Sequence, residues 1–441
     1  MTRSSKTSIG TTSSEAGSSR RRFLQISSTA ALLAAAKAAL PSGAFAQSAG
    51  PEVKGTRLGY IALTDAAPFV IAKEKGLFAK HGVPDMDIAK QASWGATRDN
   101  MALGFKNNGI DGGHILRPKT HLYSTGKVMQ NGQPLPMYTL LNLNEDGQAI
   151  SVANEYKDLA VQKDASPLKQ AFERKKAAGK ELTAAMTFPG GTHDLWIRYW
   201  LAAGGIDPDT DIKVIVVPPP QMVANMKVGT MDCFCVGEPW NEQLVNQSIG
   251  YTALTTGELW ARHPEKILGM RADFVDANPK ATQAILMAVM EAQQWADKME
   301  NRQELAEIVG KRQWFNVPTN DINKRLLGDI NYGNGREVKG TNLYMKFWGE
   351  GGSTSYPWKS LDTWFVTENI RWGKFEPTID IKALVDKTNR ADLWREAAKT
   401  LGVADAPTAD SRGVETFFDG AKFDPAAPMD YLKALKIKRV A

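Results

Sequence analysis

Three short segments of the chain combine a glycine-containing turn with the expected start of a helix. They lie at residues 94–97, 189–193 and 236–240, and the stretch before each reads as a β-strand. The first turn of a helix presents unpaired backbone N–H groups and the positive end of the helix dipole. Glycine lets a small ligand approach that backbone without obstruction by a side chain. The three segments are therefore candidates for binding a small anion.

Side chains in these segments add directed polar groups. Trp94 precedes a helix that we expect to begin at Arg98. Thr192 is a natural N-cap, which would place His193 in the first turn of its helix. Pro239 is expected at the first helical position of the third segment. Each turn alone has an ordinary structural explanation, because strand–glycine–helix turns are common in α/β proteins, so a shared function requires that the fold bring them together.

Strands and helices alternate along the part of the chain that must position these segments. A strand is expected at residues 56–61, a helix at 68–78, a second strand at 86–89 and a second helix at 98–105. Alternation on this scale predicts an α/β fold with mixed, mostly parallel sheets flanked by helices. Ligands of such sheets bind beyond the carboxyl ends of the strands, where turns of this kind gather.

A local pattern that occurs twice indicates two lobes built on one plan. Residues 100–115 and 225–236 each read as a helix end, a glycine stop and an aspartate that opens a buried strand. We expect lobe 1 at residues 55–150 plus 263–441, including a helical C-terminal region, and lobe 2 at residues 151–262. The ligand would then bind in the cleft between the lobes.

The first 46 residues have the features of a secretory signal. Arginines at 20–22 precede an apolar run at 26–40, and residues 44–46 (AFA) form a small-residue cleavage signature. Paired arginines followed by Phe-Leu favour the twin-arginine translocase as the exporting machinery. Cleavage between Ala46 and Gln47 would release the mature chain into the periplasm. An uncleaved N-terminal anchor is the alternative, although the apolar run is short for a bilayer span.

The charge distribution argues against nucleic acid as a partner. The whole chain has a formal net charge of +6, but the first 46 residues hold six basic residues and one acidic residue. The mature chain is therefore close to +1, and its basic isoelectric point reflects the signal segment. A nearly neutral protein that binds an anion must do so with a local site.

Patterns typical of catalysis or of metal binding were not found in the sequence. The five histidines lack metal-ligand spacing, and no nucleophile elbow, phosphate loop or dinucleotide fingerprint occurs. We therefore expect a non-enzyme without metal or cofactor; an exported enzyme is the competing hypothesis, because twin-arginine cargo often carries cofactors. Cys233 and Cys235 lie two apart in an expected strand and would point to opposite faces. Two reduced, buried thiols are favoured over a disulfide.

Several blocks of sequence resemble the nitrate-binding proteins of nitrate/nitrite ABC importers, with the bicarbonate-binding proteins as the nearest relatives. The resemblance covers essentially the whole mature chain. Its most specific blocks are residues 92–95, 146–150, 189–193, 236–240 and 356–360. It implies a two-lobed, C-clamp-shaped periplasmic binding protein that delivers its ligand to the permease and ATPase subunits of an ABC importer.

The resemblance also implies which residues hold the ligand. The side chains implied by position are those of Trp94, Gln148, His193 and Lys266, with backbone donors near Gly95, Thr192 and Gly237. Nitrate, like nitrite, is a small monovalent oxyanion, so neutral donors and one cation suit it. Lys266 would supply the positive charge. Glu238 would orient or neutralise a neighbouring donor, because a carboxylate in direct contact would repel the anion.

Each of these residues has a structural alternative. Gln148 could satisfy a loop backbone, His193 could begin a helix without a ligand, Trp94 could be core, and Lys266 could be a solvated surface lysine. Lys266 also separates nitrate from bicarbonate, because the bicarbonate-binding relatives are expected to carry a carboxylate here and to recruit calcium. Glu265 precedes it directly, so a shift of one residue in the alignment would reverse this interpretation. Other small or organic anions, and a cytoplasmic nitrate sensor on the same fold, are further alternatives.

Overall fold

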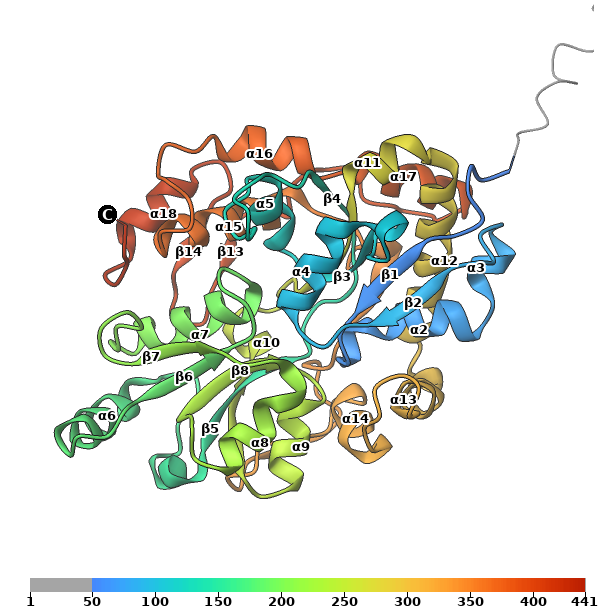
Figure 1. The fold of residues 1–441 in the computed structure, drawn as a ribbon. Helices are drawn as coiled ribbons and strands as arrows, with labels where there is room; N and C mark the ends of the chain where they lie inside the picture. The colour runs from blue at the N-terminus through green and yellow to red at the C-terminus, as the bar shows by residue number, and fades with distance from the viewer. Residues whose placement is uncertain (1–49, 441) are drawn as a thin grey trace, which may run out of the picture. The chain divides into compact units, whose positions relative to one another are not determined.

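Two five-stranded sheets, each flanked by helices, form the framework of the molecule (Figure 1). The computed structural model describes residues 50–440, so the expected signal sequence lies outside the described residues. We call the part built around the first sheet the first lobe and the part built around the second sheet the second lobe. The two-lobed α/β fold expected from the sequence is confirmed.

The two sheets have the same plan. The first has the order β2-β1-β3-β10-β4 and the second the order β7-β6-β8-β5-β9. In each, the first three strands in this order pair in parallel, and the fourth strand runs antiparallel to both of its neighbours. The strands of the first sheet are β1 (Arg57–Tyr60), β2 (Asp87–Lys90), β3 (Gly112–Leu116), β4 (Met137–Asn142) and β10 (Lys266–Arg271). Those of the second are β5 (Gln148–Ala153), β6 (Thr183–Met186), β7 (Lys213–Val216), β8 (Cys233–Gly237) and β9 (Gly250–Thr255).

The sheets are mixed and mostly parallel, as expected, because four of the five strands in each run in the same direction and only β10 or β5 runs against them. Both of these strands enter their sheet from the opposite lobe. A strand that arrives after a crossing between lobes runs against its neighbours. Helical periodicity and strand propensity carry no information on that direction.

Helices cover both sheets and form most of the C-terminal region (Figure 1). The α-helices are α2 (Ala67–Glu74), α3 (Leu77–Lys80), α4 (Trp94–Leu103), α5 (Lys119–Ser124), α6 (Ser166–Ala177), α7 (Thr192–Ala203), α8 (Met222–Lys227), α9 (Trp240–Asn246), α10 (Thr256–Leu259), α11 (Ala272–Ala277), α12 (Pro279–Asp297), α13 (Arg302–Gly310), α14 (Thr319–Leu326), α15 (Lys359–Arg371), α16 (Ile381–Thr388), α17 (Ala391–Thr400) and α18 (Pro428–Ala434). Short 3-10 helices include η1 (Thr64–Ala66), directly after β1, and η6 (Glu350–Gly352). Two small hairpins pair β11 (Ile330–Asn331) with β12 (Glu337–Val338) and β13 (Glu415–Thr416) with β14 (Lys422–Phe423).

The C-terminal region packs against both lobes. Helices α12 and α17 lie against elements of the first lobe, α2 and β4 respectively. Trp364 of α15 stacks on Trp196 of α7 in the second lobe, with 4.8 Å between ring centroids and an interplanar angle of 21°. Trp260 contacts both rings. This fully buried aromatic cluster attaches the C-terminal region to the second lobe, with a large area of apolar surface removed from water.

Cys233 and Cys235 are buried free thiols in β8, as the sequence analysis favoured. Burial raises the pKa of both thiols, which keeps them protonated and unreactive. Their side chains therefore serve as small core residues.

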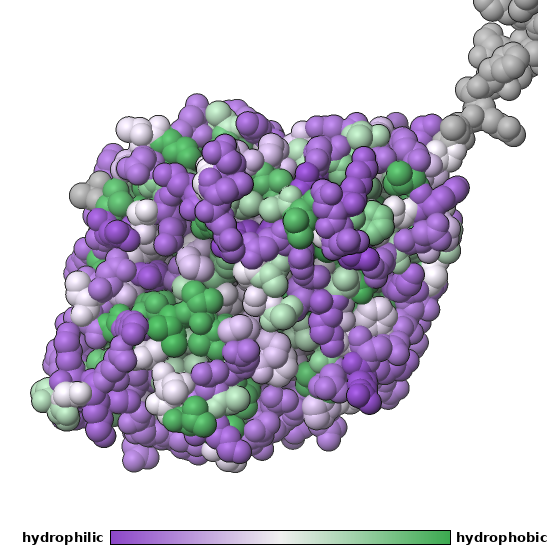
Figure 2. Space-filling model, viewed as in Figure 1, coloured by the Kyte–Doolittle hydropathy of each residue, from purple (hydrophilic) through white to green (hydrophobic). Residues whose placement is uncertain are grey.

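The face of the molecule seen in Figure 2 is mostly hydrophilic, and apolar side chains are gathered only in small groups. Within residues 50–440, no helix combines the length and the hydropathy needed to cross a membrane. The polar groups most relevant to function are instead buried between the lobes.

Candidate functional site

Two connections join the lobes and place two of the expected ligand residues. Residues 143–147 lead from β4 to β5, and residues 260–265 lead from α10 to β10. The connections lie side by side, since the Asp146 amide donates to the His263 carbonyl at 3.0 Å. Gln148 is the first residue of β5 and Lys266 the first of β10. Each connection therefore delivers a polar side chain to the region between the lobes.

Lys266 is completely buried and belongs to an ion-pair cluster. Its Nζ lies 3.0 Å from Asp65 Oδ2 and also contacts Glu265 Oε2. His114 Nε2 lies 2.6 Å from Asp65 Oδ1. Burial lowers the pKa of the Lys266 ammonium to about 8, and Asp65 opposes the shift. Burial raises the pKa of Asp65, but Lys266 and His114 outweigh this and hold it well below its usual range.

Trp94 forms a wall beside this cluster. It is the first residue of α4, and its buried ring lies 5.4 Å from the His114 ring and 5.7 Å from Lys266 Nζ. The expected helix start at Arg98 was wrong, because Ser93 is the N-cap and its Oγ accepts a hydrogen bond from the Ala96 amide at 3.0 Å. The earlier start places Gly95 in the first turn of the helix, among its unpaired amides.

The 189–193 turn reaches the same cluster from the second lobe. Helix α7 begins at Thr192 and its N-cap is Gly191, so the expected N-cap role of Thr192 was wrong. The Thr192 hydroxyl donates to Glu265 instead, while His193 occupies the first turn as expected. His193 Nδ1 lies 2.5 Å from Thr187 Oγ1, and its Nε2 lies 3.7 Å from Glu265 Oε1. Burial, followed by Lys266, lowers the pKa of His193 well below its usual value, so the ring is neutral.

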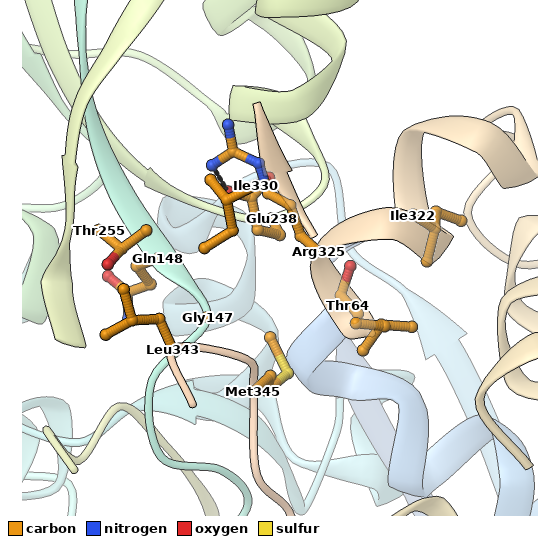
Figure 3. A pocket seen from close by; sticks show the side chains of 11 residues that line it. Thr64, Gly147, Gln148, Glu238, Thr255, Ile322, Arg325, Ile330, Leu343 and Met345 are labelled. Carbon is orange, nitrogen blue, oxygen red and sulfur yellow. Dashed lines mark hydrogen bonds and ion pairs between the residues drawn. The ribbon is translucent and has the colours of Figure 1, made fainter. Parts of the chain in front are cut away.

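Gln148 lines a small cavity beside the cluster. Figure 3 shows its side chain with those of Thr64, Thr255, Leu343 and Met345 around this cavity. Leu343 and Met345 belong to the long, largely irregular loop at residues 331–356, which therefore forms part of the cavity wall.

Three of the four expected ligand side chains have polar atoms without a hydrogen-bond partner anywhere in residues 50–440. These atoms are Trp94 Nε1, His193 Nε2 and both amide atoms of Gln148. Buried polar groups are nearly always hydrogen-bonded, so such a group calls for an explanation in terms of a water, an ion or a ligand. The atoms come from both lobes and belong to residues that the sequence resemblance assigns to the ligand. This arrangement suits a small polar ligand that accepts hydrogen bonds.

The third segment, at residues 236–240, forms contacts between the lobes. The Thr64 amide donates to the Glu238 carbonyl at 2.7 Å, and Trp240 Nε1 donates to the Ala62 carbonyl at 3.1 Å. A Cβ on Gly237 would lie 3.2 Å from Leu63, so glycine permits this close approach. Pro239 is the N-cap of α9 and Trp240 its first residue, one position later than expected. The segment thus holds the end of β8 against η1.

Glu238 faces a cation. Its Oε1 lies 2.6 Å from Arg325 Nη1, and its Oε2 accepts from the Glu242 amide at 3.2 Å (Figure 3). Arg325 also pairs with Glu242 at 2.8 Å. Burial raises the pKa of Glu238, and Arg325 opposes that shift. Glu238 and Glu242 therefore both contact the Arg325 guanidinium.

Glycine is required at two turns that bring the site together. Gly147 has φ +87°, and a Cβ there would lie 2.3 Å from the Met345 side chain. A Cβ on Gly191 would lie 2.6 Å from Leu116 of the first lobe. These glycines allow the 331–356 loop and the 189–193 turn to approach the opposite elements.

Sequence reasoning missed four residues around the site. Asp65, His114, Lys119 and Arg325 are all buried, and the sequence analysis gave none of them a role. His114 was detectable, because a histidine inside the apolar strand β3 needs a partner. Asp65 follows β1 at its carboxyl end, which is a place where site residues gather. The position of Arg325, on a helix far along the chain, had no local signal.

No group of three or more histidine, cysteine, aspartate or glutamate residues is suited to hold a metal ion in the part of the chain that the structure describes. The carboxylates of Asp65 and Glu265 surround the Lys266 ammonium, which occupies the place between them.

Two lobes of one plan, joined by paired connections around a buried polar site, define a protein of the periplasmic-binding-protein fold. The model of the NMT1-like family matches residues 49–310. The nitrate/nitrite binding protein NrtA of Synechococcus elongatus is 57% identical over 401 residues, which cover 91% of this chain and 90% of NrtA. The bicarbonate-binding protein CmpA of the same organism is 46% identical over 397 residues and 88% of each chain. The crystal structure of the periplasmic nitrate-binding protein NrtA from Synechocystis PCC 6803 matches with a TM-score of 0.85 at 57% identity, over 88% of this chain and 100% of that one.

The chain therefore belongs to the NMT1-like family, in the group of nitrate- and bicarbonate-binding proteins that its sequence resembles.

Proposed function

We propose that this chain is a solute-binding protein that captures nitrate, with nitrite as a further ligand, for an ABC importer. The observation that carries the proposal is the set of unpartnered atoms at Trp94, Gln148 and His193 beside the Lys266 ammonium. The indole and amide N–H groups are neutral donors, and His193 becomes a donor at Nε2 if the Thr187 hydroxyl donates to Nδ1. Backbone N–H groups near Gly95, Thr192 and Gly237 complete the proposed donor set.

Bicarbonate is the second candidate, because Glu265 lies in the same buried cluster as Lys266. The Glu265 carboxylate, however, already contacts the Lys266 ammonium and the Thr192 hydroxyl. It is therefore engaged within the protein, which supports nitrate as the ligand. Calorimetric titration of nitrate, nitrite and bicarbonate, each with and without calcium, separates the candidates. We expect nitrate to bind without calcium. Calcium-dependent binding of bicarbonate, with no heat from nitrate, would overturn the proposal.

The His193 side chain gives a direct test of the donor set. We expect His193→Ala to weaken nitrate binding by about 1–3 kcal/mol, the loss of a buried hydrogen bond to a charged group. His81→Ala is the matched control, because His81 pairs with Glu291 away from this site and its replacement should leave the affinity unchanged. An affinity of the His193 variant equal to that of wild type would place His193 outside the ligand contacts.

The pKa of Lys266 predicts a loss of affinity at alkaline pH. The ammonium has a pKa of about 8, so it is charged at neutral pH and loses its proton above pH 8. If nitrate binds only when Lys266 is charged, deprotonation of Lys266 should lower the affinity for nitrate by up to about tenfold per pH unit above pH 8. The guanidinium of the Lys266→Arg variant keeps its charge throughout this range. The nitrate affinity of this variant should therefore not show the decrease above pH 8. Equal slopes in the two proteins above pH 8 would contradict the prediction.

We further propose that residues 1–46 are a twin-arginine signal and that the mature chain works in the periplasm. The proposed lobes are residues 55–150 plus 263–441 and residues 151–262, with the permease and ATPase subunits of the importer as partners. A role in binding, and not in catalysis, is supported by the names of the NrtA and CmpA relatives. Mass spectrometry of protein from the periplasm should find an N-terminus at Gln47. Recovery of the uncleaved chain from the cytosol would favour the sensor hypothesis instead.

A further inference from the structure

The Lys266 charge is already balanced within the protein. Its ammonium contacts the carboxylates of both Asp65 and Glu265. The neighbouring His193 is a neutral ring, because burial lowers its pKa well below its usual value. A monovalent anion placed here would meet one cation and two carboxylates. The immediate cluster therefore does not provide a net positive charge.

A second buried lysine lies next to the same tryptophan. Lys119 is the first residue of α5 and has no exposed surface. Its Nζ donates to the Trp94 carbonyl at 2.9 Å and lies 4.6 Å from the centroid of the Trp94 ring. The ring of Phe188 lies 4.1 Å from it and that of Tyr123 lies 5.4 Å from it. Among the side chains described between residues 50 and 440, no carboxylate forms an ion pair with this ammonium.

Contacts from both lobes enclose the Lys119 ammonium. Trp94 and Tyr123 belong to the first lobe, whereas Phe188 immediately precedes the 189–193 turn of the second lobe. Cation–π contacts stabilise an ammonium, but they do not replace the hydration of a full charge. Burial is the main cause that lowers the pKa of Lys119 well below its usual value, and the positive charges of Arg98 and Lys266 add to it. Asp99 opposes the shift, but its effect is smaller than each of these. An anion nearby would restore the charged form.

Trp94 connects Lys119 to the proposed nitrate site. Its carbonyl and ring face hold the Lys119 ammonium, its ring also lies 5.7 Å from Lys266 Nζ, and its indole N–H is without an acceptor in the described chain. A ligand that accepts the indole N–H would therefore lie close to both lysines.

We propose that Lys119 supplies the uncompensated positive charge of the anion site, while Lys266, balanced by Asp65 and Glu265, acts as a directed donor. The proposal rests on the proposed binding of a small oxyanion. In this arrangement Lys119 is a positioning and charge-determining residue that acts across the Trp94 ring. It selects anions over neutral molecules of the same shape.

Two neutral variants and one charged variant of Lys119 test this role in the full mature protein. Lys119→Met keeps the length of the side chain over the rings, Lys119→Gln keeps an N–H donor for the Trp94 carbonyl, and Lys119→Arg keeps the charge. Lys73→Met is the control, because Lys73 also donates to a carbonyl, that of Met86, but is exposed and lies outside this cluster. Nitrate affinity is measured by calorimetry, and the melting temperature is measured with and without nitrate.

We expect both neutral variants to bind nitrate at least about tenfold more weakly than wild type, as expected from loss of a nearby charge in a partly buried site. Lys119→Arg should recover most of the affinity, and Lys73→Met should match wild type. If Lys119 served only in packing, its variants would have a lower melting temperature, and Lys119→Arg would not restore the affinity for nitrate. Neutral variants with wild-type affinity, or an arginine variant as weak as the neutral ones, would overturn the proposal.

The two levels of inference fail in different ways. A wild-type protein that does not bind nitrate refutes the proposed function. A wild-type protein that binds nitrate, together with unaffected neutral variants, refutes only the role of Lys119. If a neutral variant has low stability, the nitrate-induced rise in its melting temperature replaces calorimetry. If neither neutral variant folds, the arginine variant decides. Wild-type nitrate affinity of Lys119→Arg supports the role of the positive charge, and a loss of affinity in this variant contradicts it.

Discussion

Lys266→Glu is expected to abolish nitrate binding. The substitution replaces the ammonium that donates to the ligand by a carboxylate that repels it. It also places a third carboxylate beside Asp65 and Glu265 in a region without solvent access. We therefore expect a loss of stability of about 3–5 kcal/mol, the usual result of leaving buried charges without a partner. Calorimetry with nitrate and chemical unfolding of the unliganded protein measure the two effects.

A matched pair of variants separates the loss of binding from the loss of stability. Glu265→Gln removes one carboxylate, and the double variant Lys266→Met with Glu265→Gln removes the ammonium together with that carboxylate. The double variant should therefore be more stable than Lys266→Glu and should still bind nitrate much more weakly than Glu265→Gln alone. Normal nitrate binding by Lys266→Glu would show that the assignment of Lys266 is wrong.

Asp362→Asn is expected to cause the largest loss of stability outside the site. Asp362 of α15 is fully buried and pairs with Arg117 Nε of the first lobe at 2.6 Å. It also accepts from Asn389 Nδ2 at 2.7 Å, and His121 Nε2 lies 3.3 Å away. Removing this charge leaves the buried guanidinium of Arg117 without a carboxylate. We expect a decrease of about 3–5 kcal/mol in the free energy of unfolding at pH 7.

The effect of Asp362 should disappear at acidic pH. Burial raises the pKa of this carboxyl, but Arg117 and His121 outweigh burial and hold it well below its usual range. The stabilisation is therefore fully present above the ordinary pKa of about 4 and is lost as the pH falls through the lower folded value. Asp386→Asn is the control, because Asp386 pairs with Lys359 and Lys382 in solvent and should change stability by less than about 1 kcal/mol. A similar loss in both variants would contradict the prediction.

Much of the site could be predicted because its residues lie at strand ends and helix starts, which the sequence marks with glycine and proline. Trp94, His193 and Gly237 were found in this way, and the structure places all three between the lobes. Gln148 and Lys266 depended on the family resemblance. Nothing in their local sequence distinguishes them from a loop glutamine and a surface lysine.

The partners of these residues could not be predicted, because they come from distant parts of the chain. Asp65 is 201 residues from Lys266, and Arg325 is 87 residues from Glu238. The capping errors have a related cause. Thr192 has the right residue type for an N-cap, but its hydroxyl is engaged by Glu265 from the other lobe, so Gly191 is the N-cap. A tertiary contact here outweighed a local preference.

The paired connections between the lobes have a consequence for how relatives of this protein can diverge. Side chains alternate between the two faces of a strand, so one residue inserted in 143–147 or 260–265 would turn Gln148 or Lys266 away from the ligand. Length changes in homologous chains should therefore be confined to peripheral loops, while these two short segments keep constant length. Selectivity would then evolve by replacement of side chains at fixed positions.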